Sequence, residues 1–376
     1  MKKGWEQKTF ENCIEHVEYT RKVQRRDFLL EGQFPVISQE AEFTNGFWDD
    51  EADLFKLSKP VIIFGDHTQV LKYVDFDFVL GADGVKILQS RSFLWPKFFF
   101  YQLQATELPS LGYARHYRLL KELVISIPPL SEQQRIVGLL DEAFGGLATA
   151  QAHAAQNLQN ARALFESHLN AVFGDIWKDS TLVPLAELAS DITDGDHLPP
   201  PKSSHGVPFI TIGNIVKSTR HIDFSDTFKV TRDYFDSLKP NRRPRYGDVL
   251  YTVTGSFGIP VLVDNDTEFC FQRHIGLIRP KPSVNSQWLS YLMLSPQVFG
   301  QANSLATGTA QRTVSLKSLR SFVVPVVSTK KQDEMATQLN ALSAETQRLT
   351  RIYEQKLAAL AALKKSLLHQ AFSGEL

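Results

Sequence analysis

Two near-copies of one phrase, SHLNAVFG at residues 167–174 and SLLHQAFSG at residues 366–374, stand 199 residues apart in this 376-residue chain. When residue n is laid against residue n + 199 over residues 123–175, without a gap, ten positions are identical. They are Val124, Gln133, Leu140, Gln156, Leu158, Ala163, Leu164, Ser167, Leu169 and Phe173, which match Val323, Gln332, Leu339, Gln355, Leu357, Ala362, Leu363, Ser366, Leu368 and Phe372. A repeat with so long a period predicts that the chain is built twice from one kind of unit.

Apolar and small residues recur around these identities at alternating steps of four and three, which is the spacing of a helical seam. In the first copy the seam follows Ile136, Leu140, Ala143, Leu147, Ala150 and Ala154, then, after a shift of one residue, Leu158, Ala161, Phe165, Leu169 and Val172. In the second copy it follows Met335, Leu339, Leu342, Thr346, Leu349, Tyr353, Leu357 and Leu360. Since neither stretch contains a proline, each predicts a helix of about 40 residues, roughly 60 Å long.

The first seam is mostly alanine, whereas the second carries leucines and a tyrosine. A face of small residues packs closely against a face of large ones, so we expect the two helices to pair antiparallel within one molecule. The alternative is that each helix covers only the domain beside it. The residues expected to make helix or subunit contacts are Ile136, Leu140, Leu158, Leu164, Leu169, Leu339, Leu349, Leu357, Leu363 and Leu368.

The ends of both helices are also predicted. Ser131 is the expected N-cap of the first helix, and Ser328 or Thr329 that of the second, because short hydroxyl side chains satisfy free backbone N–H groups. Gly174 and Gly374 are the expected helix ends.

A block of short apolar runs separated by turn residues precedes each helix, which is typical of β-rich domains. Three segments of the first block, FPVIS, PVIIFGD and ADGVKIL, are similar to VPFIT, GDVLYTV and HIGLIRP in the second. We therefore expect an α+β fold with a pseudo-two-fold internal repeat, in which two β-rich domains are joined by two long antiparallel, coiled-coil helices. The expected division is residues 1–127, 128–175, 183–325 and 328–374.

Composition restricts the kinds of protein that this chain can be. It has two cysteines, Cys13 and Cys270, which argues against a disulfide scaffold and favours the cytoplasm. The N-terminus lacks the apolar stretch of a signal peptide, and the longest apolar runs are too short to cross a membrane. The formal net charge is zero, so binding to a polyanion must come from local patches.

Several phrases resemble one family, the specificity (S) subunits of type I restriction–modification systems, along essentially the whole chain. They are IPPLSEQQRIVGLLD, LSKPVIIFGDHTQVLKYVDFDFVLGADGVKIL, DITDGDHLPPP, GVPFITIGNI, GDVLYTVTGSFG and LLHQAFSGEL. The second helix start, VPVVSTKKQDEM, departs from the family pattern because it lacks the paired prolines and the Glu before Gln332.

The resemblance implies a non-catalytic subunit that recognises double-stranded DNA. Each β-rich domain would read one half of a bipartite, asymmetric site, and the helical pair would set the spacer and bind two methyltransferase (M) subunits. Restriction (R) subunits would join the assembly. This chain would bind no cofactor itself, and S-adenosylmethionine, ATP and Mg²⁺ would be bound by the partners.

Residues that read DNA are expected on polar loops supported by the β framework, since base edges require rigidly held donors and acceptors. The loops are 44–50, 65–69 and 112–118 in the first block, and 194–206, 239–245, 254–258, 272–274 and 308–313 in the second. The expected DNA-binding residues are Asn45, His67, Lys72, Arg115, His116, His197, Lys202, His205, Arg242, Arg243, Ser256, Arg273, His274, Gln311 and Arg312. Structural ion pairs or solvated turns are the alternative explanation for the arginines.

Other functional classes receive less support from the sequence. Asp66 beside His67 has no second pair at metal-ligand spacing, and the Asp194–His197 segment lacks the remaining ligands of a calcium loop. No P-loop, zinc cluster or amino-methyltransferase tetrapeptide is present in the sequence. The competing hypotheses are a structural adaptor with two protein-binding domains and a single-chain enzyme with an unrecognised site.

Overall fold

The computed structural model describes residues 4–82, 84–112, 114–198, 200–309, 311–373 and 375. The chain divides into two compact units, the first made from two stretches of sequence and the second from one. Unit 1 comprises Met1–Gln156 with Glu354–Leu376, and unit 2 comprises Asn157–Tyr353. Each unit therefore contains one β-rich domain and a part of each long helix.

Both predicted long helices are present and are longer than expected. Helix α4 (Leu130–Asp179) has 50 residues and helix α9 (Thr329–Ser373) has 45. The prediction that the first helix ends at Gly174 is wrong. The next turn stays helical because Ile176 and Trp177 pack against the core of unit 2. The other predicted end, Gly374, lies outside the described residues.

The two helix starts differ in their caps. In α9, Ser328 is the cap, since its side-chain oxygen accepts the N–H of Lys331 at 3.3 Å and its carbonyl accepts that of Gln332 at 3.0 Å. In α4, the prediction of Ser131 is wrong, because the carbonyl of Pro129 accepts the N–H of Gln133 at 3.0 Å. The helix thus begins one residue before Ser131.

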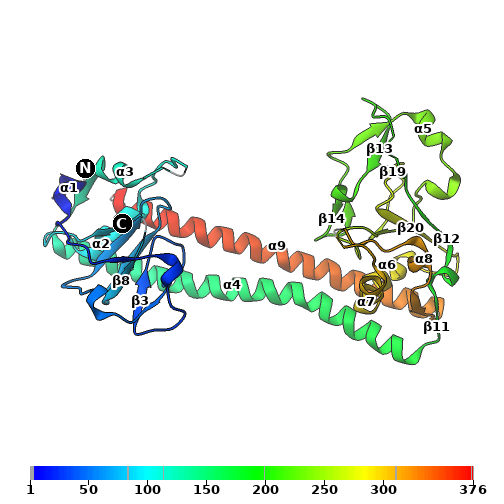
Figure 1. Ribbon diagram of the computed structural model, residues 1–376, viewed down its shortest axis with the longest axis horizontal. Helices are drawn as coiled ribbons and strands as arrows, with labels where there is room; N and C mark the ends of the chain where they lie inside the picture. The colour runs from blue at the N-terminus through cyan, green and yellow to red at the C-terminus, as the bar shows by residue number, and fades with distance from the viewer. Residues whose placement is uncertain are drawn as a thin grey trace. The chain divides into compact units, whose positions relative to one another are not determined.

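Parts of α4 and α9 pack against each other within each unit. In unit 1, Ile136 and Leu140 near the start of α4 share a core with Leu368 and Ala371 near the end of α9 (Figure 1). In unit 2, residues late in α4 share a core with residues early in α9, namely Phe165, Leu169 and Phe173 with Met335, Ala336 and Leu339. Within each unit the two segments are therefore antiparallel, as the seam predicted.

Most of the predicted packing residues lie on this seam. Ile136, Leu140, Leu169, Leu339 and Leu368 are buried, and Leu158, Leu349 and Leu357 are half-buried. The identical pair Leu164 and Leu363 is 50% and 47% exposed, so these two side chains do not pack between the long helices. One step along an α-helix turns a side chain by about 100°, and contact of this pair with another subunit stays a prediction.

β domain 1, residues 4–127 of unit 1, contains two small sheets and one additional strand pair. The outer sheet has the order β2 (Lys22–Val23), β8 (Phe78–Gly81), β3 (Phe34–Ile37) and β4 (Gly46–Trp48), with β5 (Leu54–Phe55) beside β8. The inner sheet has the order β7 (Leu71–Val74), β6 (Val61–Gly65) and β9 (Val85–Leu88). The pair is β1 (Glu6–Thr9) with β10 (Val124–Ile127), and the short helices are α1 (Phe10–Cys13), α2 (Pro96–Ala105) and α3 (Tyr117–Lys121).

β domain 2, residues 182–325 of unit 2, has a similar plan, with a smaller outer sheet, a larger inner sheet and a second strand pair. Its outer sheet is β16 (Phe228–Val230), β13 (Val207–Ile210) and β19 (Cys270–Phe271), and its inner sheet is β12 (Ala189–Asp194), β20 (Ile275–Pro280), β17 (Val249–Thr252) and β18 (Pro260–Leu262). The strand pairs are β11 (Leu182–Pro184) with β21 (Val323–Pro325) and β14 (Ile215–Val216) with β15 (His221–Ile222). The helices are α5 (Arg232–Ser237), α6 (Ser286–Leu294), α7 (Pro296–Leu305) and α8 (Leu316–Arg320).

Strand pairing confirms the internal repeat. β3 and β13 each pair antiparallel with the next strand of their sheet and parallel with a later one, β8 or β19. β6 and β17 each lie between two antiparallel neighbours. The three sequence similarities between the blocks therefore fall on strands with equivalent places in the two sheets.

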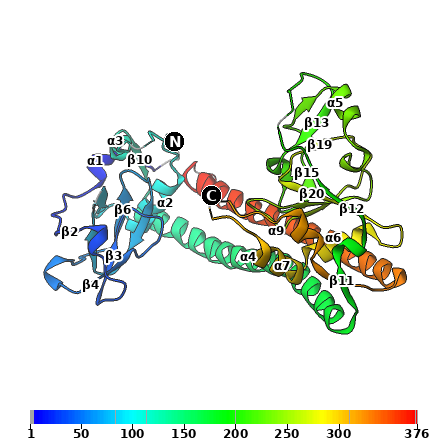
Figure 2. The same cartoon turned by 45° about the vertical axis from the view of Figure 1, so that its right-hand side comes forward.

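One helix in each unit lies between the inner sheet and the long helices. Phe98 and Leu103 of α2 share a core with Ile62 of β6 and Ile136 of α4. Trp288 and Leu292 of α6 share a core with Tyr251 of β17 and Leu339 of α9, and Figure 2 shows α6 beside α9. Helices α2 and α6 therefore each connect an inner sheet to the long-helix segments of the same unit.

Candidate nucleic-acid interface

Four of the loops predicted to read DNA meet in unit 2. Loop 254–258 joins loop 308–313 through a bridge between Thr254 and Thr313, and the Gly255 N–H donates to the carbonyl of Arg312 at 3.0 Å. The same strand end reaches loop 272–274, because the Val253 N–H donates to the carbonyl of His274 at 2.9 Å. The start of loop 194–206 joins them where the Arg273 N–H donates to the carbonyl of Asp196 at 3.0 Å. We call this group loop cluster 2.

The exposed side chains of loop cluster 2 provide donors and acceptors on a fixed backbone. Arg273, Ser256 and Gln311 are exposed, and Arg273 forms no ion pair with a carboxylate among the residues that the structure describes. Arginine and glutamine are the side chains that contact guanine and adenine in bidentate fashion. Burial, and then the charge of Arg273, lower the pKa of His274, which favours the neutral imidazole.

The remaining polar residues predicted on this side have partners within the chain. Arg312 donates to the side-chain oxygen of Asn303 at 2.8 Å and lies 5.5 Å from the ring centre of Phe257. His197 lies 3.0 Å from Asp194, Lys202 lies over the ring of Phe228, and His205 contacts Ser204; all three are exposed. Their contact with DNA stays a prediction.

The basic run 239–245 is partly used for structure. Arg242 is half-buried, and its guanidinium nitrogens lie 3.4 Å from a carboxylate oxygen of Asp194 and 4.0 Å from one of Asp196. Arg243 donates to the backbone carbonyl of Leu238 at 3.0 Å and lies over the ring of Phe235. These contacts favour the structural alternative for both arginines, and no observation tests their contact with DNA.

An equivalent loop cluster in unit 1 is organised around Asp66. The backbone carbonyl of Asp66 accepts the N–H of His116 at 2.7 Å, and its carboxylate accepts that of Tyr117 at 2.7 Å. The Asp66 N–H donates to the carbonyl of Gly84 at 2.7 Å. Loops 65–69 and 112–118 and the β8–β9 turn therefore meet, and we call them loop cluster 1. Tyr113, like Pro199 and Ala310 in the other predicted loops, lies outside the described residues.

Two predictions in unit 1 are wrong because the side chains are buried. Lys72 is 3% exposed, and its ammonium donates to the carbonyl of Phe43 at 3.2 Å, to the side chain of Asn45 at 3.0 Å and to the carbonyl of Glu42 at 2.5 Å. His116 is 1% exposed, and its ring accepts the N–H of Leu111 at 2.9 Å. Lys72 thus supports the loop at residues 42–45 and His116 the loop at Leu111, and neither side chain faces solvent.

Asn45 is the partner of Lys72 and is equally engaged. Its side-chain oxygen accepts from the N–H and the hydroxyl of Ser38, and its amide donates to the carbonyl of Glu42. The half-buried Asn45 thus closes the turn between β3 and β4. The other predicted residues of this cluster are Arg115, which is exposed, and His67, which is half-buried.

Gln69 ends the predicted loop 65–69 in loop cluster 1 but was not among the expected DNA-binding residues. It is one of two described non-glycine residues with positive φ, at 59°, and its side chain donates to the carbonyl of Pro109 at 3.3 Å. Non-glycine residues in this strained region concentrate at functional sites. No signal in a single sequence reports it, because glutamine has no preference for a left-handed conformation.

A repeated pair of hydrogen bonds connects each β domain to a long helix. The buried side chain of Gln133 in α4 accepts the N–H of Trp95, the cap of α2, at 2.7 Å. The buried side chain of Gln332 in α9 accepts the N–H of Asn285, the cap of α6, at 2.8 Å. The identity of these two glutamines at n + 199 is the sequence signal that marked them.

The second bond of each pair lies two helical turns further on. The hydroxyl of Tyr101 in α2 donates to Asp141 at 2.5 Å, and that of Tyr291 in α6 donates to Asn340 at 2.7 Å. Asp141 and Asn340 are also 199 residues apart. We call the Gln133–Tyr101 set helix anchor 1 and the Gln332–Tyr291 set helix anchor 2.

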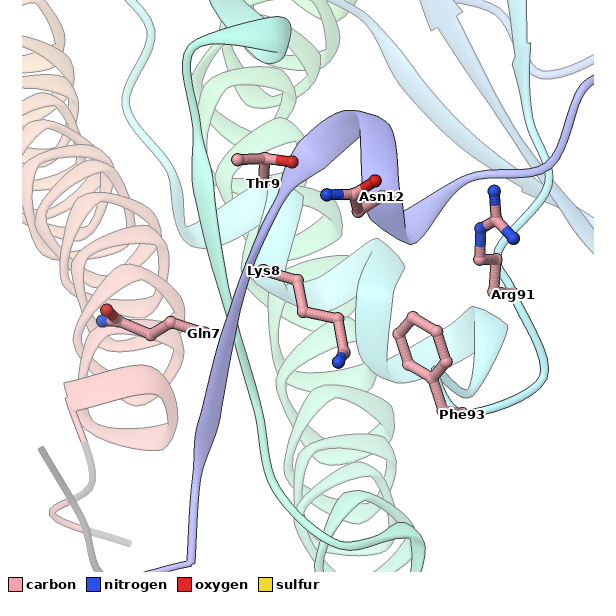
Figure 3. A pocket seen from close by; sticks show the side chains of 6 residues that line it. All are labelled: Gln7, Lys8, Thr9, Asn12, Arg91 and Phe93. Atoms are coloured by element: carbon pink, nitrogen blue, oxygen red, sulfur yellow. The ribbon is translucent and has the colours of Figure 1, made fainter.

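A polar hollow of ≈ 490 Å³ lies beside β1 and α1 in unit 1. Figure 3 shows Lys8, Asn12, Arg91 and Phe93 around it. The Lys8 ammonium already lies 3.1 Å from a carboxylate oxygen of Glu6 and 5.1 Å from the ring centre of Phe93. This hollow therefore gives little support to a small-ligand site.

Two further features are absent from the part of the chain that the structure describes. No helix there is long and apolar enough to cross a membrane. No three His, Cys, Asp or Glu side chains there lie close enough together to hold a metal ion.

Comparison with known proteins gives matches along both repeats. The family model described as the type I restriction modification DNA specificity domain matches residues 2–153 and 177–358. The type I restriction enzyme EcoBI specificity subunit of Escherichia coli is 22% identical over 289 residues, which span 69% of this chain and 60% of that subunit. The type I restriction enzyme MjaVIII specificity subunit of Methanocaldococcus jannaschii is 22% identical over 99% of this chain and 93% of its own length.

A solved structure supports the fold. A chain from the work described as "Structural basis underlying complex assembly and conformational transition of the type I R-M system" has a TM-score of 0.73 at 19% identity. The match covers 100% of this chain and 99% of that one. At this level of identity the likeness shows a shared α+β fold with two β-rich domains and two long helices.

Proposed function

The chain belongs to the type I restriction–modification DNA specificity family, and we propose that it is the subunit that reads DNA sequence in such a system. Loop clusters 1 and 2 each contact one half of a bipartite, asymmetric site in double-stranded DNA. The observation that carries the proposal is the recurrence of one loop arrangement on equivalent strands of both β domains. Two similar but non-identical reading surfaces suit two different half-sites.

The long helices have two roles in this proposal. Both helices run without a break across the boundary between the units, at Gln156–Asn157 in α4 and Tyr353–Glu354 in α9. In this proposal the helical pair sets the spacer between the half-sites, because both helices contribute to both units. Faces of the helices that are exposed in this chain bind the methyltransferase (M) subunits, two of them in the complete assembly.

Chemistry belongs to the partners in this proposal. The M subunits bind S-adenosylmethionine, and the restriction (R) subunits use ATP and Mg²⁺. This chain acts without a bound cofactor, in the cytoplasm with its DNA. Purified chain incubated with S-adenosylmethionine and DNA, without M, should transfer no methyl groups.

The decisive experiment is a footprint of the complex of this chain with its M subunits on DNA that carries the methylated motif. That motif is obtained by methylome mapping of a strain with the complete operon. We expect two protected half-sites with an accessible spacer, and an affinity that falls steeply with salt. One contiguous protected site, or a DNA affinity that does not change with salt concentration, contradicts the proposal and favours the structural adaptor.

A further inference from the structure

β domain 2 has a hairpin that β domain 1 lacks. Residues 38–45 connect β3 to β4 in unit 1, whereas residues 211–227 connect the equivalent β13 and β16 in unit 2 and include β14 and β15. Figures 1 and 2 show this hairpin on the side of β domain 2 nearest the long helices. Ile215 and Ile222 pack with Leu250 and Leu277 in the core of the domain, so the hairpin is fixed to its sheets.

Arg220 ends the hairpin turn in an unfavourable backbone conformation. Its φ is 54°, in the left-handed region that side chains with a Cβ rarely adopt. Its N–H donates to the carbonyl of Val216 at 2.7 Å, which closes the turn. The surrounding structure must compensate for such a conformation, which suggests that the direction of this side chain matters.

The side chain of Arg220 reaches α4. Its guanidinium carbon lies 5.2 Å from the ring centre of Phe165, within the range of a cation–π contact. Burial lowers the pKa of Arg220, while Tyr291 and Glu166 act in the opposite direction. A partly desolvated guanidinium gains more from an aromatic face than an exposed one does.

Phe165 also contacts β domain 2 through a second residue. The ring of Tyr291, from α6, lies 5.9 Å from that of Phe165, and the Tyr291 hydroxyl donates to Asn340 of α9. One aromatic ring of α4 thus has two partners from the same β domain, one from the helix anchor and one from the hairpin.

Unit 1 has the corresponding aromatic pair with a different cation. The ring of Tyr101 lies 5.3 Å from that of Phe144 in α4, and the cation over Phe144 is Lys364. Lys364 belongs to α9, so its contact joins helix to helix. Among the described residues, Tyr101 is thus the only partner from β domain 1 in the aromatic and cation–π contacts of Phe144.

We propose that Arg220 is a positioning residue that fixes β domain 2 on α4 through Phe165, and that it thereby restricts the spacer length accepted by the complex. The consequence for spacers rests on the proposed function. A β domain that can rotate about its anchor presents its reading loops over a range of positions, so half-sites at more than one separation become acceptable. Arg220 contacts no base in this proposal, and the half-site sequence is unchanged by its loss.

Three substitutions separate the side chain from the backbone. Arg220→Gly removes the guanidinium and relieves the left-handed strain, because glycine adopts positive φ freely. Arg220→Ala removes the guanidinium and keeps the strain, and Arg220→Lys keeps the charge without the planar face. Lys217→Ala, an exposed cation of the same turn, is the matched control.

The first measurement is hydrogen exchange of the full chain, which does not depend on DNA. We expect Arg220→Ala, which keeps the strain, to accelerate exchange in residues 215–222 by about tenfold, the effect of losing one cation–π contact of moderate strength. Lys217→Ala should leave the exchange unchanged. Equal exchange in wild type and Arg220→Ala overturns the contact itself.

The second measurement is methylation by the complex with M subunits on DNA whose spacer is shortened or lengthened by one base pair. Wild type should methylate one spacer length, Arg220→Gly and Arg220→Ala should accept a neighbouring length at unchanged half-sites, and Arg220→Lys should be intermediate. An unchanged spacer profile, or changed half-sites, overturns the role of Arg220 as a positioning residue. If the wild-type complex shows no sequence selectivity, the proposed function is overturned instead. Hydrogen exchange alone then tests the contact between Arg220 and Phe165.

Discussion

Gln133 and Gln332 make the same contact at equivalent places of the repeat. Each is buried in the first turn of a long helix. Its side-chain oxygen accepts the backbone N–H of the N-cap residue of a short apolar helix, at 2.7 Å from Trp95 and 2.8 Å from Asn285. Each also donates to a carbonyl just before its own helix, that of Pro128 or Val327. One side chain thus joins the β domain, the helix start and the strand that precedes it.

Replacing Gln133 by methionine should destabilise the protein by about 1–3 kcal/mol, because the amide groups left behind are buried without partners. Gln332→Met should have a similar effect. Urea unfolding followed in both variants measures it. The exposed neighbour Gln134 is the control, and Gln134→Met should change the free energy of unfolding by less than about 0.5 kcal/mol. Equal effects of Gln133→Met and Gln134→Met would contradict the anchor.

The two anchor tyrosines should differ in strength. Tyr101 donates to the Asp141 carboxylate, which also pairs with Lys97, whereas Tyr291 donates to the neutral side chain of Asn340. Burial, followed by the bond to Asp141, raises the pKa of Tyr101. Hydrogen bonds to charged groups contribute about 1.5–3 kcal/mol and neutral ones about 0.5–1.5.

Tyr101→Phe should therefore lower the free energy of unfolding more than Tyr291→Phe does. Asn340→Asp gives helix anchor 2 a carboxylate acceptor like that of helix anchor 1. In a double-mutant cycle, Tyr291→Phe should then lower the free energy of unfolding by more than it does beside Asn340. A coupling energy that does not change with the acceptor would disprove this account.

Lys72 should make stability depend on pH on the alkaline side. Burial lowers its pKa from 10.5 to about 8. Between these two values the unfolded chain binds more protons at this lysine than the folded chain, so stability should rise with pH from about 8 to about 10.5. Below about pH 8 both states are protonated, and the cost of burying the charge is constant.

Lys72→Met should remove that part of the pH dependence and open the turn that Asn45 closes. Chemical denaturation of wild type and variant over this pH range measures the difference between them. Lys56→Met, at an exposed lysine of the same domain, is the control. A wild-type curve that stays parallel to that of Lys72→Met throughout the range would show that Lys72 does not titrate as described.

Two arginines of unit 2 should respond differently to removal. Arg273 is exposed without a carboxylate partner in the described chain, so Arg273→Ala should weaken DNA binding by the complex with M. Loss of a phosphate contact reduces the salt slope by about one, and loss of a base contact relaxes selectivity at one position.

Arg242 pairs with Asp194 and Asp196, so Arg242→Ala should mainly destabilise loop 194–198. Salt-titrated gel shifts and hydrogen exchange separate the two outcomes. If Arg242→Ala alone lowers the salt slope, the assignment is reversed.

Much of the fold was predictable because periodic spacing of apolar residues indicates its helices and strands. The seam residues of both helices, Ile136–Val172 and Met335–Leu360, could be identified from spacing alone, since every third or fourth residue of a helix returns to the same face. The similar segments of the two blocks fell on equivalent strands, because alternation and turn residues define strands locally. The end of α4 could not be predicted, since Ile176 and Trp177 gain their stability from a core that lies elsewhere in the sequence.

The candidate site was less accessible to sequence reasoning. The loops were found because polar, glycine-containing segments between strands are exposed by default. Within those loops the sequence did not separate a lysine that faces solvent from one that is buried beneath a turn. Lys72 and His116 have the composition of DNA-binding residues, and only their surroundings show that they support the loops.

The sequence by itself determined that this protein is built twice, from a β-rich domain and a long helix, because a repeat of apolar spacing needs no partner to be visible. Only the tertiary structure decided how each domain is attached and which polar side chains are left exposed. Those properties depend on residues far apart in the chain, such as Tyr101 with Asp141 or Arg220 with Phe165, and a contact between distant residues leaves no mark on the local pattern of either segment.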